Sequence, residues 1–158
     1  MATPVIMAMV APISGWLSDR IGSRIPTVTG MACLAVGMLL MSRLGPSASS
    51  SAILVRLRLV GLGVGLFTSP NNSAIMGAVS HGHQGLASGL VATARSLGMV
   101  LGVSVIGSLF GAEVQRLLAS GGGEVGAVMA AYRHAISIGA AVAALGVLTS
   151  LVRGGITK

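Results

Sequence analysis

Residues 59–94 read LVGLGVGLFTSPNNSAIMGAVSHGHQGLASGLVATA, and no Asp, Glu, Lys or Arg interrupts them between Arg58 and Arg95. A continuous helix over this stretch would be about 54 Å long, at a rise of about 1.5 Å per residue. The hydrocarbon core of a bilayer is only about 30 Å thick, so a single crossing cannot hold the whole stretch. The chain must therefore turn back within it, and the polar segment SHGHQ at residues 80–84 is the expected place for that turn.

Four further runs without a charged side chain lie around this stretch, at residues 2–18, 25–42, 96–112 and 134–152. Hydrophobic residues make up 53% of the 158-residue chain and charged residues 8%, so polar side chains are too few to cover a water-soluble globule. Lipid must surround most of the surface, and the sequence predicts an all-α, polytopic transmembrane bundle of about five helices. Within a single transmembrane domain over residues 1–158, the helices are expected at about 2–18, 26–43, 52–78, 85–111 and 132–152.

The connections between these helices are short and show no sign of a second folded domain. The longest runs over residues 113–131 and contains a GGG sequence at residues 121–123. The first apolar run has no basic segment before it, which argues against a signal peptide. It is interpreted as the tail of a helix whose beginning is missing, and the chain as a fragment of a longer protein.

The formal net charge of +7 does not indicate nucleic-acid binding, because Lys and Arg are scattered between apolar runs and not gathered on one face. Most of them are placed as flanks of membrane spans. Cys33 is the only cysteine, which excludes an internal disulfide and a Cys-based metal centre. His81 and His83 have no further metal ligand near them in sequence, and we interpret them as loop residues. No metal and no other cofactor is therefore expected.

Glycine is unusually frequent, at 24 residues, and in lipid this favours close helix packing. On the third expected helix, residues spaced three and four apart form one face that should look into the bundle or a cavity. That face comprises Arg58, Gly61, Gly65, Ser69 and Asn72.

The fourth and fifth expected helices repeat this arrangement of small residues. One pair spaced four apart is weak evidence in a glycine-rich chain, but pairs that follow a whole helix face indicate packing. The pairs on the fourth helix are Gly85 and Gly89, Gly98 and Gly102, and Gly107 and Gly111, and the fifth helix carries Gly139, Ala143, Gly146 and Ser150.

Arginine inside a membrane span needs an explanation, because it costs roughly 3 kcal/mol near the bilayer centre on insertion scales. Arg95 should lie about 15 Å along its helix from Gly85, close to the midplane. It is either a cavity residue that attracts an anionic group or a structural donor to carbonyls of a neighbouring helix. Arg56 and Arg58 cannot share a helix face, so Arg58, on the small-residue face, is the candidate cavity residue and Arg56 is expected to snorkel to the interface.

Pro70 removes one backbone hydrogen bond from the third helix and is expected to kink it. Asn72, two residues further on, can satisfy the freed backbone groups or contact a substrate. All carboxylates of the chain are expected outside the hydrocarbon layer, so a titrating acid for proton coupling would have to come from elsewhere. They are Asp19, Glu113 and Glu124.

The turn between the first two expected helices reads GWLSDRIGSR over residues 15–24. It resembles the signature cytoplasmic loop of major facilitator superfamily transporters, of the form GxLaDrxGrrxxl, and Ser23 departs from it where a basic residue is usual. In that family the loop acts as a conformational latch between the two halves of the transporter, which implies that Asp19 has its partner outside this chain. The matching residues are Gly15, Leu17, Asp19, Arg20, Gly22 and Arg24.

Residues 56–110 resemble the second half of multidrug and drug:proton antiporters of the twelve- and fourteen-helix branches. The similarity is strongest in GLASGLVATARSLGMVLG at residues 85–102, which resembles the segment GxASGLxxTxRxLGxxLG of those transporters. The resemblance implies that the five helices are the last five of a twelve-helix core, a partial half of a major facilitator fold. The amino-terminal half of that fold would then be missing.

The function implied by the resemblance is secondary active transport across the plasma membrane, with export of small or hydrophobic compounds coupled to protons. The partners would be the lipid bilayer, a small-molecule substrate, protons and the missing amino-terminal half. One partial half cannot enclose a midplane site, so the chain alone is expected not to transport. No enzymatic activity is expected, because the serine of GLASG has no base at a defined position. A different class stays open: a small membrane protein that self-associates through its glycine faces in a structural or regulatory role.

Overall fold

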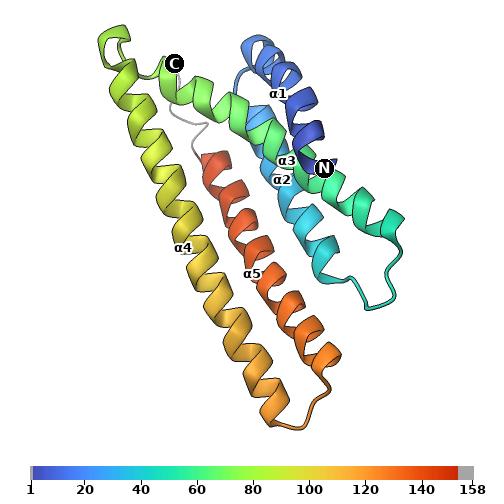
Figure 1. Ribbon diagram of the computed structural model, residues 1–158. Coiled ribbons are helices and arrows are strands. Elements are labelled where there is room, and N and C mark those ends of the chain that lie inside the picture. The colour runs from blue at the N-terminus through green and yellow to red at the C-terminus, as the bar shows by residue number, and fades with distance from the viewer. Residues whose placement is uncertain (1, 153–158) are drawn as a thin grey trace. The chain divides into compact units, whose positions relative to one another are not determined.

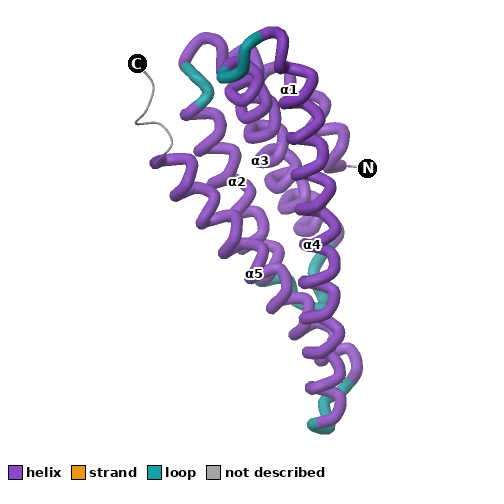
Figure 2. The backbone as a smooth tube through the Cα atoms, turned by 90° about the vertical axis from the view of Figure 1, so that its left-hand side faces the viewer, coloured by secondary structure: helices purple, strands orange, loops and turns teal. Residues whose placement is uncertain are grey.

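The structure of the chain is a computed structural model that describes residues 2–152, with the side chains of residues 6–151. Within this range every regular element is a helix and none is a strand, which confirms the all-α prediction (Figure 2). The elements are α1 (Ala2–Ile21), α2 (Arg24–Ser42), α3 (Ser50–Gly77), the short 3-10 helix η1 (His81–His83), α4 (Gln84–Ala119) and α5 (Glu124–Val152) (Figure 1).

The ends of α4 and α5 differ from the sequence prediction, which assigned residues 113–131 to a connection. The helices continue up to a four-residue turn at residues 120–123. Gly121, at φ +83°, ends α4, and its N–H donates to the carbonyl of Leu118 at 3.0 Å, while the N–H of Gly122 donates to the carbonyl of Leu117 at 3.1 Å. This pair of bonds is a Schellman motif, which stops a helix at a glycine. The prediction ended the helices where charged residues begin, but a helix can continue beyond the hydrocarbon layer.

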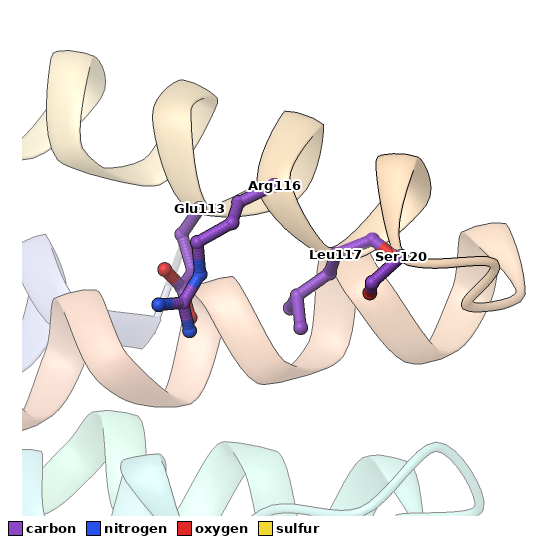
Figure 3. A network of polar contacts seen from close by, with 4 residues as sticks. All are labelled: Glu113, Arg116, Leu117 and Ser120. Carbon is purple, nitrogen blue, oxygen red and sulfur yellow. The ribbon is translucent and has the colours of Figure 1, made fainter.

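The last turns of α4 carry polar contacts that suit an aqueous or headgroup environment (Figure 3). Arg116 Nη2 lies 3.1 Å from Glu113 Oε1, and the Ser120 hydroxyl donates to the carbonyl of Leu117 at 2.8 Å. An exposed ion pair of this kind adds little stability. The two contacts join residues three positions apart, as expected where the α-helix continues beyond residue 112.

The chain divides into two compact units, and each is described by itself. The first comprises Met1–Ala74 and Ile136–Lys158, and the second comprises Ile75–Ala135. The first unit therefore contains α1, α2, most of α3 and the later part of α5. The second contains the end of α3, η1, α4 and the beginning of α5.

Within the first unit, α2 packs on α3 through glycines whose backbones nearly touch. A Cβ atom built on Gly63 would lie 2.6 Å from the backbone nitrogen of Leu34 and 2.8 Å from the carbonyl oxygen of Gly30. At Gly37 a Cβ atom would lie 2.9 Å from Val60 Cγ2. Such close approach is how helices associate in lipid, where burying apolar side chains alone gains little.

A second contact of α2 is with α5, and it has a different form. The Cε atom of Met38 fills the place that a Cβ atom would take on Gly139, and Met31 does the same at Gly146. The two methionines are seven residues apart on α2, and the two glycines are seven residues apart on α5. Two flexible side chains of α2 therefore fill the space above two glycines on one face of α5. The face predicted for this helix from Gly139 and Gly146 is thus turned toward α2.

The buried part of the chain consists almost entirely of small residues. Among the described residues the buried apolar side chains are Leu44 and five alanines, whereas Leu86 and Val103 on α4 are 65% and 76% exposed. A water-soluble domain would bury such large side chains to offset its conformational entropy. An exposed apolar surface of this extent favours an environment of lipid over water.

Within residues 2–152, four helices are long and apolar enough to cross a bilayer. α1, predicted as a fifth span, is not among them; it contains Pro12 and ends with charged residues. The four candidate spans are Arg24–Ser42, Ser50–Gly77, His81–Ala119 and Glu124–Leu151.

Candidate functional site

The charged turn with the transporter-like signature joins the end of α1 to the start of α2. Gly22 adopts φ +83°, a left-handed conformation that glycine reaches without steric cost, and this allows the chain to reverse within two residues. Ser23 precedes the first helical residue of α2, and its carbonyl accepts a 2.6 Å bond from the Thr27 hydroxyl. Asp19 is exposed and Leu17 is half-buried. The carboxylate of Asp19 is thus available to a group outside the turn.

The two arginines of this turn have different environments. The Arg20 guanidinium lies 4.2 Å from the centre of the Trp16 ring, a cation–π contact within one helix. Arg24 Nη2 donates a 3.0 Å hydrogen bond to the carbonyl of Leu151 in the last turn of α5. A cation at this place satisfies a free helix-end carbonyl and complements the helix dipole. The sequence gives no signal for this contact, because the two residues lie 127 positions apart.

Polar residues gather where α1 crosses α3. The Ser14 hydroxyl is fully buried and donates a 3.0 Å bond to the carbonyl of Leu66. Gly15 lies beside it, and a Cβ atom there would be 3.1 Å from Ser69 Oγ. Pro70, less than 2% exposed, follows directly on α3, which continues as helix to Gly77. The kink at Pro70 stays a prediction, and the contribution of Ser14 was not predicted from the sequence.

Asn72 and the two arginines of α3 are the polar groups predicted to lie near a cavity. Asn72 Oδ1 is buried and has no hydrogen-bond partner among the described residues. Arg58 is exposed, whereas Arg56 is half-buried and its Nη1 is buried without a partner in the described chain. The arginine with a desolvated donor is therefore Arg56, the one expected to reach the interface. An orphaned buried donor or acceptor is costly and calls for a partner.

The candidate residues of α4 lie in the second unit, whereas those of α3 lie in the first. Arg95 is exposed. A Cβ atom on any of the six predicted packing glycines of α4 would have no described atom within 4 Å, while on α3 Gly61 is buried and a Cβ atom on Gly65 would lie 3.2 Å from Val10. These glycines of α4 are Gly85, Gly89, Gly98, Gly102, Gly107 and Gly111.

The histidine segment forms the 3-10 helix η1 ahead of α4. The Ser80 hydroxyl and His83 Nδ1 are 2.8 Å apart, which ties the turn together. Within residues 2–152, no three His, Cys, Asp or Glu side chains gather as a set that could hold a metal ion. The segment is a hydrogen-bonded connection between α3 and α4.

Together these features define a class of protein: a multi-pass α-helical membrane protein with small-residue packing and a charged reversal between two of its helices. A family model described as Major Facilitator Superfamily matches residues 1–154 of the chain. The chain belongs to this family of membrane transporters, which confirms the relationship that the signature turn predicted. Its members are transporters and not enzymes, so the bilayer and a transported substrate are the partners the family implies.

Curated relatives cover a range of transported compounds. The chain is 37% identical over 112 residues to a multidrug resistance protein, Stp, of Mycobacterium tuberculosis, covering 71% of the chain and 21% of the relative. It is 35% identical over 107 residues to a riboflavin transporter, RibZ, of Clostridioides difficile, covering 68% of the chain and 24% of the relative. It is 30% identical over 139 residues to a triacylglyceride transporter of Mycolicibacterium smegmatis, covering 79% of the chain and 25% of the relative. The chain thus spans about a fifth to a quarter of the length of these relatives.

Proposed function

We propose that the chain is part of a secondary active exporter of small or hydrophobic compounds, coupled to protons and located in the plasma membrane. The observation that supports this most is the 37% identity to a protein named for multidrug resistance, together with the matching signature turn at residues 15–24. The names of other relatives, for riboflavin and triacylglyceride, favour a site that accepts ligands of varied chemistry.

The five helices are proposed to form a single transmembrane domain that corresponds to the last five helices of a twelve-helix core. One continuous family match over residues 1–154 supports this. Such a domain needs the preceding helices to enclose a midplane site, so the chain alone does not transport. Asp19, exposed at the turn, is proposed to contact that other half as part of a latch.

Three polar residues are proposed to face the substrate pathway. Asn72 is supported by a buried side-chain oxygen without a partner, which suits a hydroxyl or amine donor from a ligand. Arg95 is supported by its place as the only charged residue between positions 84 and 112 of α4, since a charge within a membrane span usually has a functional role. Arg58 is exposed and is proposed to lie at the entrance of the pathway.

The decisive experiment is a segment exchange with a related transporter. The 112 aligned residues of the chain replace the matching segment of the M. tuberculosis multidrug resistance relative, and the chimera is expressed in a drug-sensitive bacterial host. Efflux of a compound to which the intact relative confers resistance is measured with and without an uncoupler. We expect uncoupler-sensitive efflux from the chimera, none from the chain alone, and at least a tenfold loss on Arg95→Ala. A chimera that reaches the membrane in normal amounts but moves no such compound would count against the proposal.

The open glycine pairs of α4 support a second candidate, self-association of the chain through this helix. It predicts a homogeneous oligomer of the chain alone in detergent, measured by light scattering. Gly98→Leu and Gly102→Leu should abolish that oligomer, because leucine prevents close backbone approach. A monomer at all concentrations would remove this candidate and leave the transporter proposal standing.

A further inference from the structure

The hydrogen bond between Ser14 and Leu66 joins α1 to the one place on α3 where the helical bonding is interrupted. In an α-helix, the N–H of residue i donates to the carbonyl of residue i−4. Pro70 has no N–H, so the carbonyl it leaves without a donor is that of Leu66. This is the carbonyl to which the Ser14 hydroxyl donates at 3.0 Å.

The surroundings of this bond show that it lies in a closely packed, dry contact. Ser14 and Pro70 are both less than 2% exposed. α1 approaches α3 closely on either side of the bond, because a Cβ atom on Gly65 would lie 3.2 Å from Val10 and one on Gly15 would lie 3.1 Å from Ser69 Oγ. The side chain of serine is short, so it reaches a backbone carbonyl of another helix only where the two helices approach closely. A carbonyl without a donor here could not turn to water.

We propose that the Ser14 hydroxyl takes the place of the N–H that Pro70 lacks, and that this bond holds α3 continuous through the proline. α1 and α3 then behave as one hydrogen-bonded pair, and release of Ser14 from Leu66 frees α3 to bend at Pro70. Asn72 lies two residues beyond the proline, so Ser14 is also a positioning residue for that side chain. The bond between Ser14 and Leu66 has this role in α1 and α3 whether or not the protein has the proposed transport function.

The sequence allows the Leu66 carbonyl to be observed selectively by NMR. Its two phenylalanines, Phe67 and Phe110, are each preceded by leucine, Leu66 and Leu109. Labelling with carbonyl-13C leucine and 15N phenylalanine therefore gives two amide–carbonyl NMR cross peaks, one for the carbonyl in question and one for a regular position in α4. The experiment uses the full chain in detergent micelles.

Ser14→Ala is expected to move the Leu66 carbonyl resonance upfield, as loss of a hydrogen bond does, and to leave Leu109 in place. Ser18→Ala is the matched control, since Ser18 is also buried on α1 one turn further on. It should move neither peak. An unchanged Leu66 resonance in a folded Ser14→Ala chain would overturn the proposal.

Pro70→Ala supplies the independent test, because the new backbone N–H can donate to Leu66 in place of Ser14. In that background Ser14→Ala should no longer move the Leu66 resonance. Deuterium uptake around residues 67–74 should rise several-fold for Ser14→Ala in the native background and stay level in the Pro70→Ala background. Equal increases in both backgrounds would contradict the exchange of donors. Should Ser14→Ala fail to fold, the double variant is expected to recover folding, and its failure to do so would also contradict it.

Discussion

At the scale of single residues, the glycines of this chain differ in the space that surrounds them and therefore in how well they tolerate a larger side chain. Gly63 is enclosed by backbone, with the nitrogen of Leu34 at 2.6 Å from the place of a Cβ atom. Gly146 is covered by the end of the Met31 side chain, which can move aside. Gly102 has no described atom within 4 Å of that place. The same substitution by alanine therefore has three different consequences.

Gly63→Ala should lower the free energy of unfolding by about 1–3 kcal/mol, because backbone cannot give way to the added methyl group. Gly146→Ala should cost less, and Gly102→Ala should be neutral or stabilise by up to about 1 kcal/mol through helix propensity. Trp16 is the only tryptophan, so its fluorescence reports unfolding of the chain in mixed micelles as the fraction of denaturing detergent is raised. Equal effects of the three substitutions would show that the close contact of α2 and α3 is absent.

Gly22 is limited by its backbone conformation and not by space. Its φ of +83° is unfavourable for any residue with a Cβ atom, although nothing described lies within 4 Å. We expect Gly22→Ala to destabilise the turn by about 1–2 kcal/mol and Gly22→Asn by less, because asparagine tolerates this conformation. The measurement is the same detergent unfolding curve. Gly45→Ala, also in open space but without a positive φ, is the control and should leave the curve unchanged.

At the scale of helices, the ends of elements are held by contacts that short-range sequence patterns do not reveal. Arg24 binds the carbonyl of Leu151, so the start of α2 fastens the end of α5. Loss of a cation at a helix C-terminus typically costs about 0.3–1 kcal/mol at an exposed site. The effect is local, because only the last turn depends on it.

Arg24→Gln should therefore speed hydrogen exchange in the last turn of α5 severalfold without changing exchange in the rest of that helix. Arg20→Gln is the matched control, since its guanidinium lies over Trp16 and not at a helix end. Mass spectrometry of the exchanged chain, digested under quench conditions, gives both values. Equal exchange in the two variants would mean that the bond does not hold α5.

The number and type of the helices could be predicted from the sequence, because uncharged apolar runs have only one stable backbone form in lipid. The long stretch at residues 59–94 divides at η1, within the SHGHQ segment as predicted. The ends of α4 and α5 could not be predicted from charge, since Gly121 stops α4 by its backbone bonds. Charge and hydropathy mark the hydrocarbon layer, whereas capping bonds mark the end of a helix.

The candidate site was less predictable than the fold. The turn at Gly22 was placed correctly from its sequence, because a local signature describes a local structure. The contact of Gly30 with Gly63 could not be predicted from glycines spaced four apart on one helix, because these two residues meet across two helices. The roles of Arg56 and Arg58 were predicted from the helix face on which each residue lies. A helix face does not indicate which neighbouring residues bury Arg56 Nη1. Contacts between distant segments need the three-dimensional structure.

At the scale of the whole molecule, many large apolar side chains of the described residues are exposed, and the buried apolar ones are small except for Leu44. This is the reverse of a water-soluble core, and it favours insertion of the chain in a bilayer. The turn at Ser23 and the turn at residues 120–123 are separated by α2, α3 and α4, which are all candidate spans. We predict that each of these helices crosses the bilayer once, which puts the two turns on opposite sides of the membrane.

Cysteine labelling tests this topology in a Cys33→Ser background. Ser23→Cys and Gly123→Cys are suitable sites, because a Cβ atom on Gly123 has open space whereas one on Gly122 would meet the Leu117 carbonyl at 2.8 Å. A membrane-impermeant maleimide should label only one of the two in intact cells and both after permeabilisation. Labelling of both turns in intact cells would exclude three crossings between them.

The scarcity of bulky buried side chains also decides how this protein can change during evolution. In most globular proteins the largest interior residues tolerate substitution least, but here Leu86 and Val103 are exposed, and exchange among leucine, valine and isoleucine at these positions should cost little. The intolerant positions are those where nothing larger than a hydrogen atom fits, such as Gly30 and Gly63. In saturation mutagenesis of this chain, tolerance to substitution should therefore rise with the volume of the native side chain, and the least tolerant positions should be its smallest residues.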